Sequence, residues 1–161
     1  MQKVLIVEDE PSNMQVFCEL FSMKGYNVWE ATTGREALDA GDRCAGPIDL
    51  VLCDLILPDI SGTNVALELV KSHPEAAILL VSGTPRNIWS SCDAQNFSML
   101  APGSADFLEK PFLPAALERK VEDLLNSQSI PRAAETDHAT QSVGSSARYA
   151  TRTGGGGAGE F

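Results

Sequence analysis

Short apolar runs that end in charged or hydroxyl-bearing residues recur along this chain, and they limit its fold more than any other feature. In an open parallel sheet, the carboxyl ends of the strands form the edge where ligands bind. If the runs are parallel strands, then carboxylates, a hydroxyl and an ammonium group meet at one edge. The runs are residues 3–7 before Glu8, residues 48–53 before Asp54, residues 76–81 before Ser82, and residues 106–109 before Lys110.

Apolar residues also recur at helical spacing between the runs, which is typical of βα units that build a parallel sheet. Met14, Phe17 and Phe21 mark one face of a first helix, and Gly25 is suited to end it. We therefore predict an α/β fold with a parallel sheet. The predicted strands are residues 3–7, 26–31, 48–53, 76–81 and 105–109.

Three further helices are predicted from caps and spacing. Residues 33–36 read Thr-Gly-Arg-Glu, a capping box that opens a second helix. A third helix runs through Val65 and Leu69 and ends near His73, which precedes a proline. Leucine and valine at helical spacing then predict the last helix. Its apolar residues are Leu113, Leu117, Val121, Leu124 and Leu125.

The stretch from residue 84 to residue 104 has the least regular pattern. We predict a helix over residues 86–95 with Ile88 and Trp89 facing inward, although Asn, Ser, Pro and Gly nearby weaken the pattern. This stretch is where the sequence constrains the structure least.

Length and composition favour one domain followed by a tail in the 161 residues. Residues 1–126 hold nineteen acidic and nine basic side chains, a net charge of −10. Such a domain has no electrostatic attraction to nucleic acid or to an anionic membrane, so neither is predicted as a partner. Residues 127–161 contain few large apolar side chains and are predicted to be a flexible, disordered tail or linker.

The cysteines and the hydropathy favour a cytoplasmic protein. Four cysteines lack CxxC spacing, and we predict reduced thiols, with Cys18 and Cys53 filling the core. We see no signal peptide, and no stretch approaches the roughly 20 apolar residues that a membrane span requires.

The strand-end residues have the chemistry of a metal and phosphoryl site. Glu8, Asp9 and Asp54 form a cluster of hard oxygen ligands of the kind that Mg²⁺ prefers. Phosphoryl transfer needs charge compensation more than covalent help, and Lys110 supplies a point charge. Three close carboxylates repel one another, so the site is expected to need its cation.

Two other acids nearby are predicted to lie outside this site. Glu10 is interpreted as a solvated loop residue. Asp59 follows Pro58 and is interpreted as a turn residue.

The motifs at the strand ends are Val-Glu-Asp-Glu-Pro (7–11), Asp-Leu-Ile-Leu-Pro-Asp-Ile-Ser-Gly (54–62), Val-Ser-Gly (81–83) and Phe-Leu-Glu-Lys-Pro-Phe (107–112). In this order they resemble the receiver domain of two-component response regulators, over about residues 3–126. The resemblance implies a flavodoxin-like, doubly wound five-stranded parallel sheet with strand order 2-1-3-4-5 and helices on both faces.

The same resemblance implies a role for each residue. Asp54 is the nucleophile that accepts a phosphoryl group, with Mg²⁺ held by Glu8, Asp9, Asp54 and the backbone carbonyl of Ile56. Lys110 pairs with a phosphoryl oxygen, and its bond to Pro111 is the family's cis peptide. The switch pair is Ser82, which donates to the phosphoryl group, and Phe107, the aromatic residue that turns inward but here lacks a hydroxyl.

The resemblance also implies partners: a histidine kinase or histidine phosphotransfer protein as donor, and a downstream output protein or domain. It predicts no independent enzymatic turnover. The chain is interpreted as a stand-alone regulator, or as a receiver from a hybrid histidine kinase or larger transcription regulator.

Two other classes of protein fit the sequence less well. A phosphohydrolase has Asp-x-Asp at the nucleophile, but Asp54 is followed by Leu-Ile. A flavin or nucleotide binder needs a Gly- or Ser/Thr-rich loop where Glu-Asp-Glu-Pro stands.

The phosphorylated state is expected to be long-lived. In the family, access of the hydrolytic water is tuned two residues after the acceptor and two after the hydroxyl residue. These positions are Ile56 and Thr84 here, and neither is an acid or carboxamide that orients water well.

Overall fold

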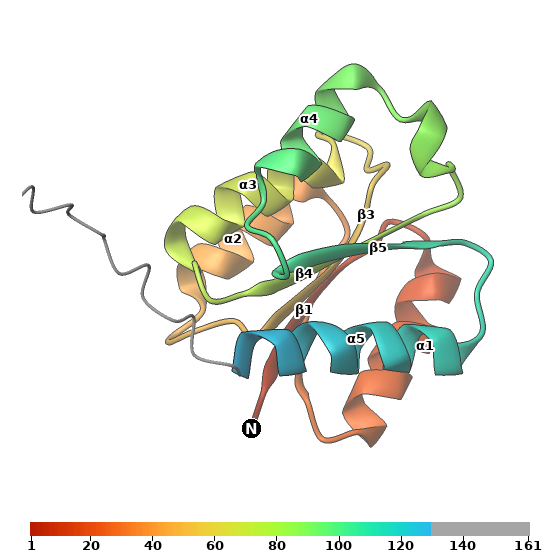
Figure 1. Cartoon of the computed structure of the whole chain (residues 1–161). Coiled ribbons are helices and arrows are strands. Elements are labelled where there is room, and N and C mark those ends of the chain that lie inside the picture. The colour runs from red at the N-terminus through yellow and green to blue at the C-terminus, as the bar shows by residue number, and fades with distance from the viewer. Residues whose placement is uncertain (130–161) are drawn as a thin grey trace, which may run out of the picture.

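The apolar runs form five parallel strands in the order β2-β1-β3-β4-β5, which confirms the predicted sheet (Figure 1). The computed structural model describes residues 1–129. Its elements, in chain order, are β1 (Lys3–Val7), α1 (Pro11–Met23), β2 (Asn27–Ala31), α2 (Gly34–Arg43), β3 (Leu50–Asp54), α3 (Gly62–Ser72), β4 (Ala77–Ser82), a 3₁₀ turn (Arg86–Ile88), α4 (Ser91–Met99), β5 (Ala105–Glu109) and α5 (Pro114–Ser129).

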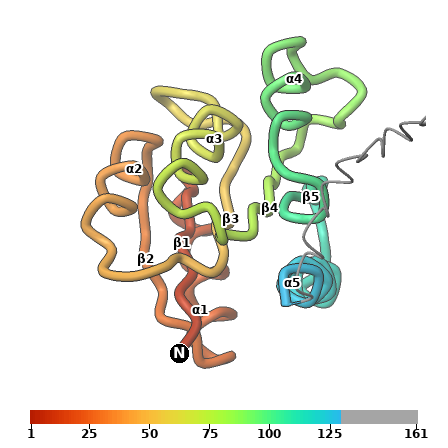
Figure 2. Tube along the Cα trace, turned by 60° about the vertical axis from the view of Figure 1, so that its left-hand side comes forward, coloured from red at the N-terminus to blue at the C-terminus, as the bar shows by residue number. Residues whose placement is uncertain are grey.

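The central strands are apolar throughout because helices cover both faces of the sheet. Every residue of β3 and β4 is buried, whereas the edge strands β2 and β5 consist mostly of half-buried and exposed residues. Figures 1 and 2 show α2, α3 and α4 on one side of the sheet and α1 and α5 on the other. The core is therefore split into two layers, one packed on each face.

The predicted helix signals act nearly as expected. Pro11 begins α1, and Gly25 follows its end with a φ of +83°, a conformation that favours glycine. At α2, the side chain of Thr33 accepts from the amide of Glu36 at 3.1 Å. The returning carboxylate of Glu36 accepts from the amide of Thr32 at 2.7 Å.

Gly62 allows α3 to begin directly behind the end of β3. A Cβ atom at this position would lie 2.0 Å from the carbonyl oxygen of Asp54. The amide of Gly62 also donates to the carbonyl of Leu55 at 2.8 Å. A side chain here would push α3 away from the strand end, so the glycine helps to fix the backbone that carries Asp54.

The predicted helix over residues 86–95 is wrong in its start, in its end, which lies at Met99, and in one of its inward residues. Residues 86–88 form a 3₁₀ turn, and α4 begins only at Ser91. The reason is a cap, because the side chain of Ser90 accepts from the amide of Asp93 at 3.0 Å. Ile88 is consequently 64% exposed, whereas Trp89 is buried as predicted, at 9% exposure.

The last helix is confirmed, with one apolar residue wrongly assigned to its face. Leu117, Val121 and Leu124 are buried, but Leu113 precedes the helix and is 75% exposed. The helix begins at Pro114, whose fixed φ suits a first turn. It continues to Ser129, three residues past the predicted boundary at residue 126, and the rest of the predicted tail lies outside the described residues.

The four cysteines differ in burial, and their reduced state stays a prediction. All four cysteines lie in the described part of the chain without a disulfide; Cys53 is buried and Cys18 half-buried. Burial raises the pKa of Cys18 to about 12, helped by the neighbouring Glu30.

No helix within residues 1–129 combines the length and the apolar character needed to cross a bilayer.

Candidate phosphoacceptor site

The strand register brings the predicted site residues to one edge of the sheet. Val7 pairs with Cys53 between β1 and β3, so the acids that follow β1 lie beside Asp54. Asp54 in turn pairs with Val81 of β4, which precedes Ser82. Because β5 ends beside β4, Lys110 also arrives at this edge.

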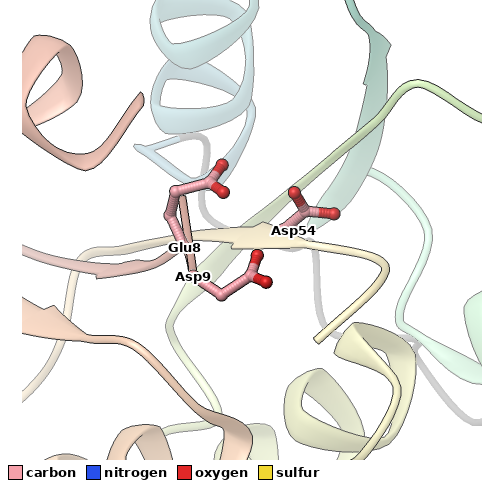
Figure 3. A group of neighbouring side chains, drawn as sticks. All are labelled: Glu8, Asp9 and Asp54. Atoms are coloured by element: carbon pink, nitrogen blue, oxygen red, sulfur yellow. The ribbon is translucent and has the colours of Figure 1, made fainter. Parts of the chain in front are cut away.

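Three carboxylates gather at the edge around a common space (Figure 3). One oxygen each from Glu8, Asp9 and Asp54 lies within 4.8 Å of the others. Glu8 is 1% exposed and Asp54 8% exposed, whereas Asp9 faces solvent. A set of hard oxygen ligands at this spacing fits a divalent cation such as Mg²⁺, with room for further ligands from the solvent side.

Lys110 is the cation that compensates the buried carboxylates. Its ammonium donates to Glu8 at 2.8 Å and to Asp54 at 2.7 Å. Burial alone would lower the pKa of Lys110, but these hydrogen bonds outweigh it and raise the pKa above its ordinary value. Burial also raises the pKa of Glu8, with Lys110 acting in the opposite direction. The bond between Lys110 and Pro111 is cis, as the resemblance implied.

The two oxygens of Asp54 have different partners. One accepts from Lys110, and the other accepts from the amide of Ile56 at 2.9 Å. The carboxylate is thus held in one orientation by a backbone group and a side chain. The side chain of Ile56 is 63% exposed beside it. Its carbonyl stays a predicted metal ligand.

Ser82 ends β4 and Phe107 lies in β5, and their role as a switch pair stays a prediction. Ser82 is 1% exposed, and its hydroxyl accepts from the amide of Thr84 at 3.1 Å. The carbonyl of Ser82 accepts from the amide of Lys110 at 2.9 Å, which ties β4 to the residue after β5. Phe107 is half-buried and packs against Trp89.

The acids placed outside the site have other contacts. Glu10 is exposed and accepts from Ser12 at 3.0 Å. Asp59 accepts from the amides of Gly34 and Arg35 at 2.8 and 2.9 Å, so it caps the start of α2. The hydrogen bond from the Arg35 amide is the main cause that lowers the pKa of Asp59. The sequence predicted a turn residue here but gave no signal for a cap 25 residues away.

Sequence reasoning missed two residues that organise the segment between β4 and β5. The carboxylate of Asp93 accepts from the hydroxyls of Thr63 and Ser90, both at 2.6 Å, and from that of Ser61. The ring of Trp89 was predicted to be inward, but its contacts were not foreseen. The Ser-x-x-Asp spacing at residues 90–93 was a usable capping signal, whereas the bonds to α3 left no trace in the sequence.

Comparison with known proteins shows the family. The model of the response regulator receiver domain matches residues 4–122. The chain therefore belongs to the receiver domain family of two-component response regulators. Receiver domains are phosphoacceptor signalling modules and not independent enzymes, which sets aside the phosphohydrolase alternative.

Among curated proteins, the chain is 33% identical over 125 residues to the sensor kinase CckA of Brucella abortus. It is 24% identical over 125 residues to the response regulator SaeR of Staphylococcus aureus. These alignments cover 78% of this chain in both cases, but 13% of the kinase and 51% of the regulator. The chain therefore spans about half or less of the length of these relatives.

Solved structures agree with the fold. A CheY-like receiver domain protein of Methanospirillum hungatei JF-1 gives a TM-score of 0.69 at 25% identity, covering 80% of this chain and 97% of that one. A receiver protein of Sinorhizobium medicae WSM419 gives 0.68 at 27% identity, covering 79% and 96%. The receiver domain of the hybrid histidine kinase CckA gives 0.62 at 29% identity, covering 76% and 98%.

Proposed function

We propose that Asp54 accepts a phosphoryl group from the phosphohistidine of a histidine kinase or histidine phosphotransfer protein. A carboxylate oxygen of Asp54 attacks phosphorus, and the P–N bond breaks with its electron pair remaining on the imidazole. The observation that carries the proposal is the nearly buried carboxylate of Asp54, bound by Lys110 at 2.7 Å and grouped with Glu8 and Asp9.

Each residue around Asp54 has a separate electrostatic role in the transfer of the phosphoryl group. Glu8, Asp9 and Asp54 would hold Mg²⁺, which would supply positive charge to the transferring oxygens. Lys110 already touches Asp54, so it needs little movement to pair with an oxygen of the incoming group. The amide of Ile56 holds one oxygen of the nucleophile in place. The backbone carbonyl of Ile56 is proposed as a further metal ligand.

The readout is proposed to pass through the switch pair. Once Asp54 carries the phosphoryl group, the hydroxyl of Ser82 donates to it and Phe107 turns inward, which biases a state already sampled. The surface formed by residues 83–126 then changes its affinity for a downstream output protein or domain. A cytoplasmic location belongs to the same proposal and is supported by the family.

The phosphoacceptor is tested by incubation with acetyl phosphate and Mg²⁺, followed by mapping of the adduct by mass spectrometry. We expect the label on Asp54 and none on Asp54→Asn. Asp59→Asn is the matched control, since Asp59 lies in the next turn yet outside the acidic group. Labelling of Asp54→Asn at the wild-type level would refute the assignment.

A further inference from the structure

Trp89 is joined by hydrogen bonds to the hydroxyl of Ser82. The indole N–H donates to the carbonyl of Thr84 at 3.1 Å. The amide of Thr84 donates to the hydroxyl of Ser82, also at 3.1 Å. Thr84 therefore links the indole to a hydroxyl at the edge of the phosphoacceptor site through its two backbone groups.

The ring of Trp89 also contacts the elements on the other side of this segment. It meets the ring of Phe107 on β5 edge to face at a centroid distance of 4.8 Å, and that of Phe97 on α4 at 5.6 Å. The guanidinium of Arg86 lies 4.5 Å from the centroid of Phe97 and extends the stack. Trp89 thus stands at the junction of β4, α4 and β5.

The side chain of Phe107 has no polar atom that could form a hydrogen bond with the segment after β4. Ser82 has a hydroxyl but no large apolar face. Trp89 carries both a hydrogen-bond donor and a large apolar face. At 9% exposure, the indole N–H has little access to water and depends on the Thr84 carbonyl.

We propose that Trp89 is a positioning residue that transmits the state of Ser82 to Phe107 and α4. The proposal rests on the function proposed above. To donate to a phosphoryl oxygen on Asp54, the hydroxyl of Ser82 must move toward it. Its bond to the Thr84 amide then breaks or pulls Thr84 along.

A pull on Thr84 displaces the carbonyl that holds the indole, and a broken bond frees Thr84, and with it this carbonyl, to move. Because the ring of Trp89 is packed edge to face on two other rings, it cannot shift without moving them. Phosphorylation at Asp54 thereby changes the positions of β5 and α4 through the contacts of Trp89.

The first test uses Trp89 as its own reporter. Trp29 lies on β2, at the opposite edge of the sheet from β5, so Trp29→Phe leaves Trp89 as the sole tryptophan. Beryllofluoride with Mg²⁺ serves as the phosphoryl mimic. We expect the Trp89 emission to change and to saturate together with the NMR shift of the Ile56 amide, which contacts Asp54. Silent emission in a protein whose Ile56 amide shifts overturns the proposal.

The second test removes the N–H and keeps an aromatic ring. In Trp89→Phe, beryllofluoride should still shift the Ile56 amide, while the shifts at Phe97 and Phe107 are largely lost. Trp29→Phe is the matched control and should keep both responses. Wild-type shifts at Phe97 and Phe107 in Trp89→Phe overturn the role of Trp89. The absence of any Ile56 response in the wild-type protein would instead count against the proposed function itself.

Discussion

The strand-end site and the segment between β4 and β5 are held in place by different interactions. Glu8 and Asp54 project from strands in the centre of the sheet, where β3 and β4 are wholly buried. By contrast, none of the residues of α4, all within the described part of the chain, is buried. That helix is positioned by the hydrogen bonds of Asp93 and Asn96 and by aromatic contacts through Phe97.

We propose from this difference that the site is rigid and that the segment between β4 and β5, residues 83–104, is deformable and reads out phosphorylation. Apolar burial of about 25 cal/mol per Å² holds the central strands, so the site geometry persists with or without a ligand. A helix fixed by a few polar bonds opens at lower free energy than the core strands. We therefore infer that a phosphoryl group, which adds only a few hydrogen bonds, is able to shift residues 83–104 without disturbing the sheet.

The largest effect is expected at the rigid site, where one acid is removed. Asp9→Ala should weaken Mg²⁺ binding by about 10-fold or more, since the loss of even indirect partners costs 10–100-fold at metal sites. Binding is measured by Mg²⁺ titration followed by amide shifts at Ile56.

Glu10→Ala is the matched control, because Glu10 is adjacent but outside the acidic group. It should titrate like the wild-type protein. An Asp9→Ala protein that binds Mg²⁺ normally, or an equal loss from Glu10→Ala, contradicts this prediction.

A smaller effect is expected at the exposed side of the same site. Ile56→Asn places a carboxamide beside Asp54, where it can orient the hydrolytic water. It should shorten the lifetime of the phosphorylated protein by several-fold, less than the roughly 10²-fold or more that general acid–base groups contribute. Decay is followed in Mg²⁺ buffer after phosphorylation with acetyl phosphate. Ile56→Val is the control, since it keeps an apolar side chain. Decay of Ile56→Asn at the wild-type rate would show that water positioning at residue 56 does not set the lifetime.

The same difference explains what the sequence predicted. Continuous apolar runs predict the strands, and the parallel arrangement brings the strand ends together. Glu8, Asp54 and Lys110 were therefore found from local patterns alone. The placement of α4 depends on Asp93 reaching Thr63, a contact across 30 residues between polar side chains. No periodicity encodes such a contact. The 3₁₀ turn likewise put Ile88 outward, because the cap at Ser90 delays the helix.

At the deformable segment, Asp93→Ala should lower the free energy of unfolding by about 1–2 kcal/mol through the lost cap and hydroxyl bonds. The loss should be local, so amide hydrogen exchange should accelerate in residues 91–99 more than in β3. Gln95→Ala on the same helix is the control, because Gln95 is exposed. Unchanged protection of α4 in Asp93→Ala would mean that the other contacts, the hydrogen bonds of Asn96 to α3 and the aromatic packing, hold this helix without Asp93.

The smallest effect is expected on acidification. Burial would raise the pKa of Asp93, but hydrogen bonds from Ser61, Ser90 and Thr63 outweigh it and lower the pKa below its ordinary value of 3.8. A depressed folded-state pKa contributes stability that is complete above the ordinary value and is lost as the pH falls through the lower one. Protection of the α4 amides should therefore decline in that acidic window.

Capping carboxylates at α2 also titrate with lowered pKa values, so the wild-type protein must be compared with Asp93→Asn. The variant should lack the α4 step while keeping the α2 step, and an identical acid profile at α4 in both proteins would contradict the assignment.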